Sequence, residues 1–269
     1  MRPAFVALLL CVFAPPVMAD AKVKMLTDVL RISEVIQILQ QEGIDHGVEL
    51  DQTMLNGQGG AFWSGQINRI YDANRMQEVL RRALETGLTD QDVESSLAYF
   101  SREDSQRIIT LENEARRMIA DPEVEQHARR NYEATSGSDD QLLSNVTEFI
   151  SVNDLLERNV ASALTSSFQF YRGLSDGGYY KRSEADILQE VWADQDAIRD
   201  DTQSWLFGFF LMAYQPLEAE RLRDYIAFSK SPAGRNLNAA LFDGFGTMYN
   251  DISYALGRAV ALNVQGDEI

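Results

Sequence analysis

Residues 216–241 read PLEAERLRDYIAFSKSPAGRNLNAAL, and this stretch indicates the fold more clearly than any other. Its first part predicts an amphipathic helix, because Leu217, Leu222 and Ile226 form an apolar stripe between charged residues. Ser231 and Pro232 then mark a second helix start. A hydroxyl there can cap free backbone N–H groups, and a proline at the first helical position needs no N–H. The stretch therefore predicts two consecutive helices joined by a very short turn.

A short motif spans this junction. It consists of an apolar residue followed at fixed spacing by Phe228, Ser231, Pro232 and Gly234. The motif resembles the signature of a bacterial exported family, the domain-of-unknown-function family numbered 2059, and the resemblance is clearest over residues 190–250. It implies a helical fold and export from the cytoplasm. It implies no reaction and no catalytic residue, because the family has no assigned biochemistry.

Apolar residues recur with helical spacing through nearly the whole chain. The pattern predicts further helices over residues 24–39, 62–84, 142–170 and 183–214. Typical helix ends and starts lie between them: Gly87, a capping box at Thr89 and Asp92, Asp121 before Pro122, Gly177–Gly178, and Ser183 with Asp186. No window shows the sustained apolar–polar alternation of a strand, so we expect an all-α helical array or bundle.

The polar segment TSGSDD, residues 135–140, divides the chain into two helical halves, residues 20–135 and 141–269. When the halves are aligned in the register that places Trp63 on Trp192, several apolar positions and helix ends of the two halves coincide. The first half lacks the Ser-Pro-x-Gly part of the motif. We therefore expect a tandem duplication with a degenerate first copy. The alternative is a single helical array whose helices share an ordinary period.

Residues 1–19 have the features of a signal peptide. Arg2 gives a positive start, residues 4–13 form an apolar run too short to span a bilayer, and the small residue Ala19 precedes the predicted cleavage point. We expect cleavage after Ala19 and a mature periplasmic protein without a membrane-spanning segment. The alternative is a lipoprotein acylated at Cys11, although this cysteine lacks the small residues expected just before it.

Charge and composition disfavour several classes of partner, ligand and reaction. A net charge of −17 disfavours nucleic acid and anionic lipid surfaces as partners. His46 and His127 are too far apart in sequence for a metal motif, and cleavage would remove the only cysteine, so we expect no metal and no cofactor. The acidic residues at positions 194, 196, 200 and 201 lack the calcium-loop pattern and indicate a solvated face. No catalytic constellation is visible, so we expect a protein that is not an enzyme.

Residues 205–214, WLFGFFLMAY, are apolar on every side of a helix, and such a helix must be enclosed. We expect helices of the second half to enclose it and to leave an apolar groove beside Trp205, Phe209 and Met212. The alternative is a central core helix between the two halves that borders no ligand. The predicted function is a periplasmic module that binds an envelope protein or an apolar ligand. One alternative is a structural or assembly protein without a pocket. A hydrolase that uses paired carboxylates is a less favoured one.

Overall fold

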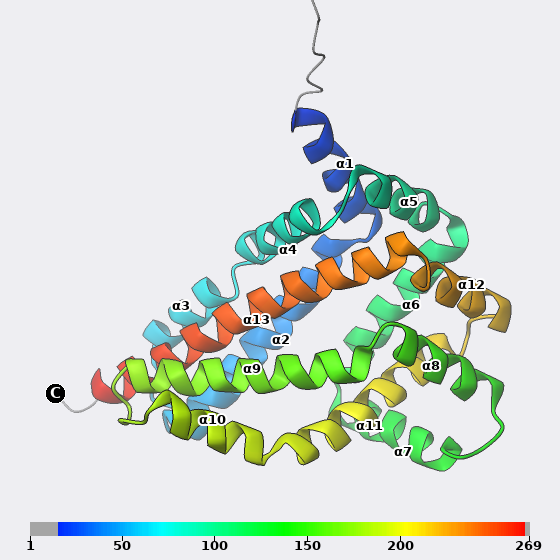
Figure 1. Ribbon diagram of the computed structural model, residues 1–269. Coiled ribbons are helices and arrows are strands. Elements are labelled where there is room, and N and C mark those ends of the chain that lie inside the picture. Colours follow the sequence, from blue (N-terminus) through cyan, green and yellow to red (C-terminus); the bar gives the residue numbers. More distant parts are fainter. Residues whose placement is uncertain (1–15, 267–269) are drawn as a thin grey trace, which may run out of the picture.

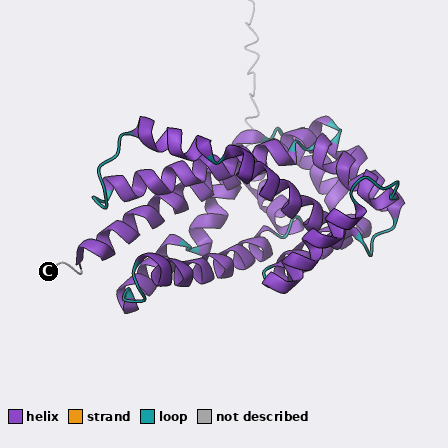
Figure 2. Cartoon of the chain, turned by 90° about the horizontal axis from the view of Figure 1, so that it is seen from below, coloured by secondary structure: helices purple, strands orange, loops and turns teal. Residues whose placement is uncertain are grey.

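The computed structural model describes residues 16–266, which form thirteen helices and no strand. The all-α prediction is confirmed, and Figure 2 shows helices joined by short loops. The predicted apolar run of the signal peptide lies outside the described residues, and the expected cleavage point after Ala19 falls in the first turn of the first helix. Within the described part of the chain, no helix has both the length and the apolar character that crossing a membrane requires.

The bounds of the helices are α1 (Pro16–Val29), α2 (Ile32–Met54), α3 (Gly60–Ile70), α4 (Ala73–Gly87), α5 (Asp90–Phe100), α6 (Glu103–Ile119), α7 (Pro122–Thr135), α8 (Gln141–Val152), α9 (Leu155–Asp176), α10 (Glu184–Ala193), α11 (Gln195–Tyr214), α12 (Ala219–Ser229) and α13 (Pro232–Gly266). Figure 1 shows α13 running through the middle of the array. This helix packs along α9 and along α4.

Local sequence chemistry explains many of the helix ends. Thr89 and Asp92 form the predicted capping box at the start of α5, and Pro122 opens α7 after the cap Asp121. The Ser231 hydroxyl accepts a hydrogen bond from the Gly234 N–H at 3.0 Å, as expected for the cap of α13. The polar segment 135–140 separates α7 from α8.

Each of the four long helices predicted outside residues 216–241 is wrong in extent, because each is broken into two. The break between α1 and α2 contains Arg31 with φ 51°, and the break between α8 and α9 contains Asp154 with φ 53°. Neither left-handed residue is a glycine, so the usual sequence signal for such a break is missing. The other two breaks lie at residues 71–72 and at Asp194.

Helices of the two halves correspond in order and in packing. In the register that places Trp63 on Trp192, the starts of α5 and α6 fall on the starts of α12 and α13. The left-handed residues Arg31 and Asp154 both separate the first helix of a half from its second. The packing of α1 on α4 and α5 is matched by that of α8 on α11 and α12. These correspondences support the duplication, which stays a prediction.

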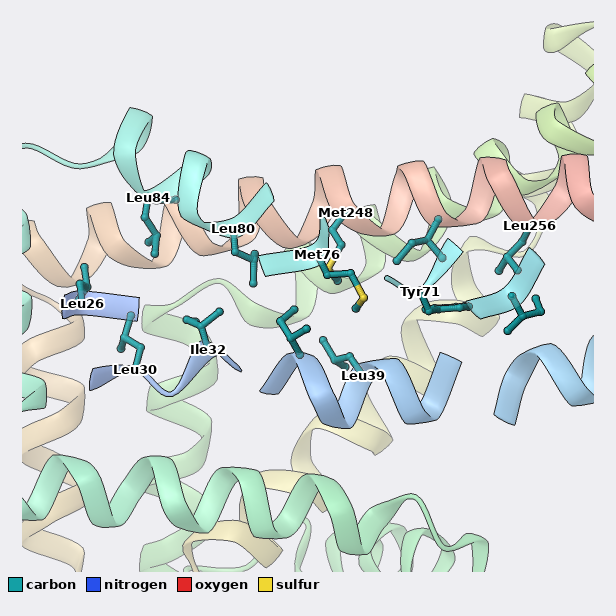
Figure 3. Close-up of a cluster of buried hydrophobic side chains, with 14 of the residues drawn as sticks. Leu26, Leu30, Ile32, Leu39, Tyr71, Met76, Leu80, Leu84, Met248 and Leu256 are labelled. Carbon is teal, nitrogen blue, oxygen red and sulfur yellow. The ribbon is translucent and has the colours of Figure 1, made fainter. Parts of the chain in front are cut away.

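The two halves interlock instead of forming separate domains. α6 of the first half packs along α11 of the second half, and α13 of the second half packs along α4 of the first half. Figure 3 shows the result in the larger core, where Met76 and Leu80 of α4 lie beside Met248 of α13. Tyr99 and Phe228, which occupy corresponding positions of the two halves, stack on each other with ring centroids 4.1 Å apart. Residues 135–140 therefore divide the sequence but not the packing.

We expect Gly234→Ala to destabilise the protein, because its new Cβ would lie 2.1 Å from the carbonyl oxygen of Phe228 and 2.9 Å from the Cα of Ser229. The ends of α12 and α13 would have to move apart, at a cost of about 1–3 kcal/mol in the free energy of unfolding. Urea denaturation followed by circular dichroism measures this cost. Gly246→Ala in the same helix is the control, since nothing lies within 4 Å of its new Cβ. Equal losses in both variants would contradict the close approach.

Candidate functional site

The apolar segment 205–214 forms the second half of α11, and helices of both halves enclose it. This helix packs on α6 and α7 of the first half as well as on α8 and α9 of the second. Phe207 stacks on Tyr132 of α7 with ring centroids 4.6 Å apart, and Gly208 allows the α7 backbone at Ala128 to come close. The expectation that helices of the second half enclose this segment is therefore incomplete, because α6 and α7 of the first half form one of its walls, as the alternative of a core helix between the halves implies.

One of the three predicted groove residues, Phe209, borders the pocket between the halves. Phe209 is buried and lines a pocket of about 320 Å³ between the halves. Trp205 is half-buried and lies between two groups, since it stacks on Phe209 with centroids 5.1 Å apart and the Arg116 guanidinium covers its ring at 5.2 Å. Met212 is also half-buried and packs into the core around α11. Trp205 and Met212 do not line this pocket.

Aromatic rings form much of the pocket wall. They come from five helices, α5, α8, α11, α12 and α13, and belong to Phe100, Phe149, Phe209, Phe210, Tyr225, Phe228 and Phe245. Several of these rings touch, and Phe149 lies 4.9 Å from Tyr225 and 5.2 Å from Phe210 between centroids. Phe100 of the first half joins this group through its contacts with Tyr225 and Phe228 of the second half.

The family-like motif reaches the same pocket from α12 and α13. Phe228 and Gly234 line it, whereas Ser231 and Pro232 do not. The latter two residues begin α13 and so fix where its first turn lies. The motif residues thus have two roles: two of them shape the wall, and two of them set the helix start that positions it.

Corresponding positions of α6 and α13 face this space with different chemistry. In the same register of the two halves, the wall contains Ile109 with Asn238, Glu112 with Leu241, and Arg116 with Phe245. The first half contributes a carboxylate and a guanidinium, and the second contributes apolar side chains at the same two positions. The charged side chains of the pocket wall therefore come from α6, whereas α13 contributes uncharged ones.

Glu112 is the acidic side chain of the wall. Its Oε1 accepts a hydrogen bond from the Tyr214 hydroxyl at 2.5 Å. Burial raises the pKa of Glu112 to about 7, and the bond from Tyr214 opposes this effect only in part. No cation of the described residues forms an ion pair with this carboxylate. A buried charge without a partner is costly, and this cost raises the pKa of the carboxyl group. Carboxyl groups with perturbed pKa values are common in functional sites.

Arg116 is the basic side chain of the wall, and its charge is already compensated. Its Nε and Nη2 donate to the two carboxylate oxygens of Glu42 on α2 at 2.7 and 2.6 Å. This is the paired geometry that binds a guanidinium most firmly. The wall therefore contains one satisfied cation and one carboxylate without a cationic partner.

Sequence analysis missed Glu112, although a signal for it exists. The buried residues of α6 include Ile108, Ile109, Ala115 and Ile119. Glu112 lies three or four positions from three of them, which places it on the apolar stripe of this helix. A carboxylate on an apolar stripe indicates a buried polar site more strongly than an acidic residue on an exposed face.

The other candidate ligands of the sequence lie apart from the pocket. His46 on α2 and His127 on α7 are both exposed. The acidic residues at positions 194, 196, 200 and 201 are exposed too, and Asp201 pairs with Arg129 at 3.1 Å. Within residues 16–266, no group of three or more potential metal-binding side chains gathers.

Comparisons with known proteins add no relative to this geometry. Neither protein-family models nor curated proteins nor solved structures gave a match to the chain. The resemblance to the family numbered 2059 therefore stays a prediction that rests on the motif at residues 228–234.

We expect the stability of the wild-type protein to fall, relative to Glu112→Gln, as pH rises from about 4.5 to about 7. Below 4.5 the carboxyl is protonated in both the folded and the unfolded chain. Between the two values only the unfolded chain releases the proton, and this favours unfolding. The expected change in the difference between the two unfolding free energies is about 3 kcal/mol.

Urea denaturation of both proteins at about pH 5 and about pH 8 measures this difference. The exposed Glu114 on the same helix provides the control, because Glu114→Gln removes a carboxylate that stays in water. A difference for Glu112→Gln that does not change with pH would mean that the folded protein does not disfavour the charge of Glu112.

Proposed function

We propose that this protein is a periplasmic, non-enzymatic helical module that binds an apolar ligand in the pocket between its two halves. One observation carries the proposal: aromatic and other apolar side chains of both halves line an open pocket of about 320 Å³ where the halves meet. Pockets for small molecules are typically of this size or larger and mostly apolar.

The composition of the wall favours binding over hydrolysis. A hydrolase that uses two carboxylates needs both of them at the reacting bond. Among the described residues that line the pocket, Glu112 is the single carboxylate, and its hydrogen-bond partner is the hydroxyl of Tyr214. Aromatic side chains, by contrast, bury large apolar areas of a guest and fix its orientation through ring contacts.

Export to the periplasm rests on residues 1–19. We expect the mature chain to begin at Asp20, because a short apolar run ends before Ala19. Intact mass spectrometry of the protein from its own host gives the mature terminus. A mass that matches a chain acylated at Cys11 would replace this prediction with a membrane-anchored lipoprotein.

A role in assembly is the second candidate, and an exposed apolar patch on α10 favours it. Leu188 and Trp192 are 47% and 52% exposed and lie beside Phe168 of α9. Exposed apolar patches of this kind often mark protein contacts. Sedimentation velocity over a range of concentrations would show association, and Trp192→Ser should abolish association that uses this patch.

The neutral fluorescent dye N-phenyl-1-naphthylamine tests ligand binding in the pocket. We expect the wild-type protein to bind it with an increase in emission. Leu241→Trp adds bulk to the half-buried wall and should weaken binding by about tenfold or more, since the guest loses apolar contact area. Val48→Trp is the matched control, because Val48 is 54% exposed on α2 and lies outside the wall.

Circular dichroism must show that both variants keep their helices. A folded Leu241→Trp protein that binds the dye as the wild type does would place the binding site elsewhere. A wild-type protein that does not bind the dye, and from which native mass spectrometry recovers no bound ligand, would contradict the proposed function and favour the assembly role.

A further inference from the structure

Glu112 lines the pocket, and its carboxylate has one oxygen without a hydrogen bond from the described residues. Its Oε1 is bonded to Tyr214, and no hydrogen bond from a described residue reaches its Oε2. Tyr225 also lines the pocket, and its hydroxyl has no hydrogen-bond partner among the described residues. One carboxylate oxygen and one hydroxyl of the wall are therefore free to bind a polar group of a guest.

Glu112 and Arg116 are the charged side chains of the pocket wall, and Arg116 is already paired with Glu42, so an ionised Glu112 carries a negative charge without a cationic partner. Tyr214 of α11 bonds it, and Tyr225 of α12 and Tyr99 of α5 lie close enough for its charge to raise their pKa values, after burial as the main cause. The guanidinium of Arg116 faces Glu42 of α2 instead. α7 and α13 contribute no charged side chain to the wall.

The rings around this carboxylate suit a cation. Ammonium groups are attracted to the faces of aromatic rings, and the attraction is stronger where water is excluded. Tyr225, Phe149 and Phe210 belong to one group of touching rings in the wall that Glu112 also lines. An aromatic wall with one carboxylate is the combination that holds an apolar body and its ammonium group together.

We infer that the ligand of this pocket is an organic amine with an apolar body, whose ammonium group binds Glu112 while its body packs against the aromatic wall. This inference rests on the proposed function, since it names the class of ligand for the same pocket. The ammonium supplies the positive charge that the protein itself does not place beside Glu112. A neutral apolar guest would leave this carboxyl without that partner.

Binding of such an amine depends on pH in a defined direction. The free protein holds Glu112 largely protonated below pH 7, because burial raises its pKa to about 7. The ammonium binds the ionised carboxylate, so affinity rises as pH increases from about 5 to about 8, a range in which an alkylamine stays protonated. A neutral analogue of the same shape gains nothing from this change.

Isothermal titration calorimetry with 2-naphthylmethylamine and its neutral analogue 2-naphthalenemethanol tests the inference. We expect the wild-type protein at about pH 8 to bind the amine about tenfold or more tightly than the alcohol. Glu112→Gln should abolish this preference and leave alcohol binding within about twofold, because the glutamine oxygen can still accept the bond from Tyr214. Glu114→Gln, which changes an exposed residue of the same helix, should keep the preference.

The outcomes separate this inference from the proposed function. Equal affinity for amine and alcohol, or tighter binding of 2-naphthylacetate, would overturn the inference and leave the proposed function supported. Binding of none of the three compounds would contradict both. Should Glu112→Gln fail to fold, the comparison of the three compounds on the wild-type protein, at about pH 5 and about pH 8, still decides between these results.

Discussion

The apolar half of α11 has no side that can face water, and the arrangement of the surrounding helices follows from enclosing it. Phe209, Phe210 and Leu211 are all buried there, and each such side chain contributes about 1.5–3 kcal/mol by leaving water. The helices of its own half cover only part of its circumference. Two helices of the first half, α6 and α7, complete the enclosure, and α13 packs in return on α4. The halves are therefore interlocked by the need to bury one helix.

The pocket is a consequence of this interlocking. Bulky rings from both halves meet where α6 and α13 present corresponding positions, and they leave space between them. The two helices differ at these positions, since Glu112 and Arg116 on α6 stand where α13 has Leu241 and Phe245. The pocket between the two halves therefore has its charged side chains on α6 and uncharged side chains on α13, a difference that two identical halves would not provide.

The sequence predicted those features that rest on local chemistry. Helix starts with a capping side chain, such as those at Thr89 and Ser231, lie where they were expected, and so does the all-α class. The breaks at Arg31 and Asp154 were missed, because a left-handed residue without glycine leaves no local signal and is held by tertiary packing. Phe209 and the motif residue Phe228 were predicted for unrelated reasons, and only the fold shows that they share one wall. The packing of α6 and α13 on helices of the other half depends on long-range contacts, which the periodicity of the sequence does not encode.

A crystal structure of the protein grown with N-phenyl-1-naphthylamine tests most directly whether the space between the halves is a binding pocket. We expect electron density for the dye among α6, α11, α12 and α13, in contact with Phe209 and Phe228 and within reach of Glu112. Density for the dye only on the outer surface would contradict this, and so would a crystal structure in which the surrounding rings close the space completely.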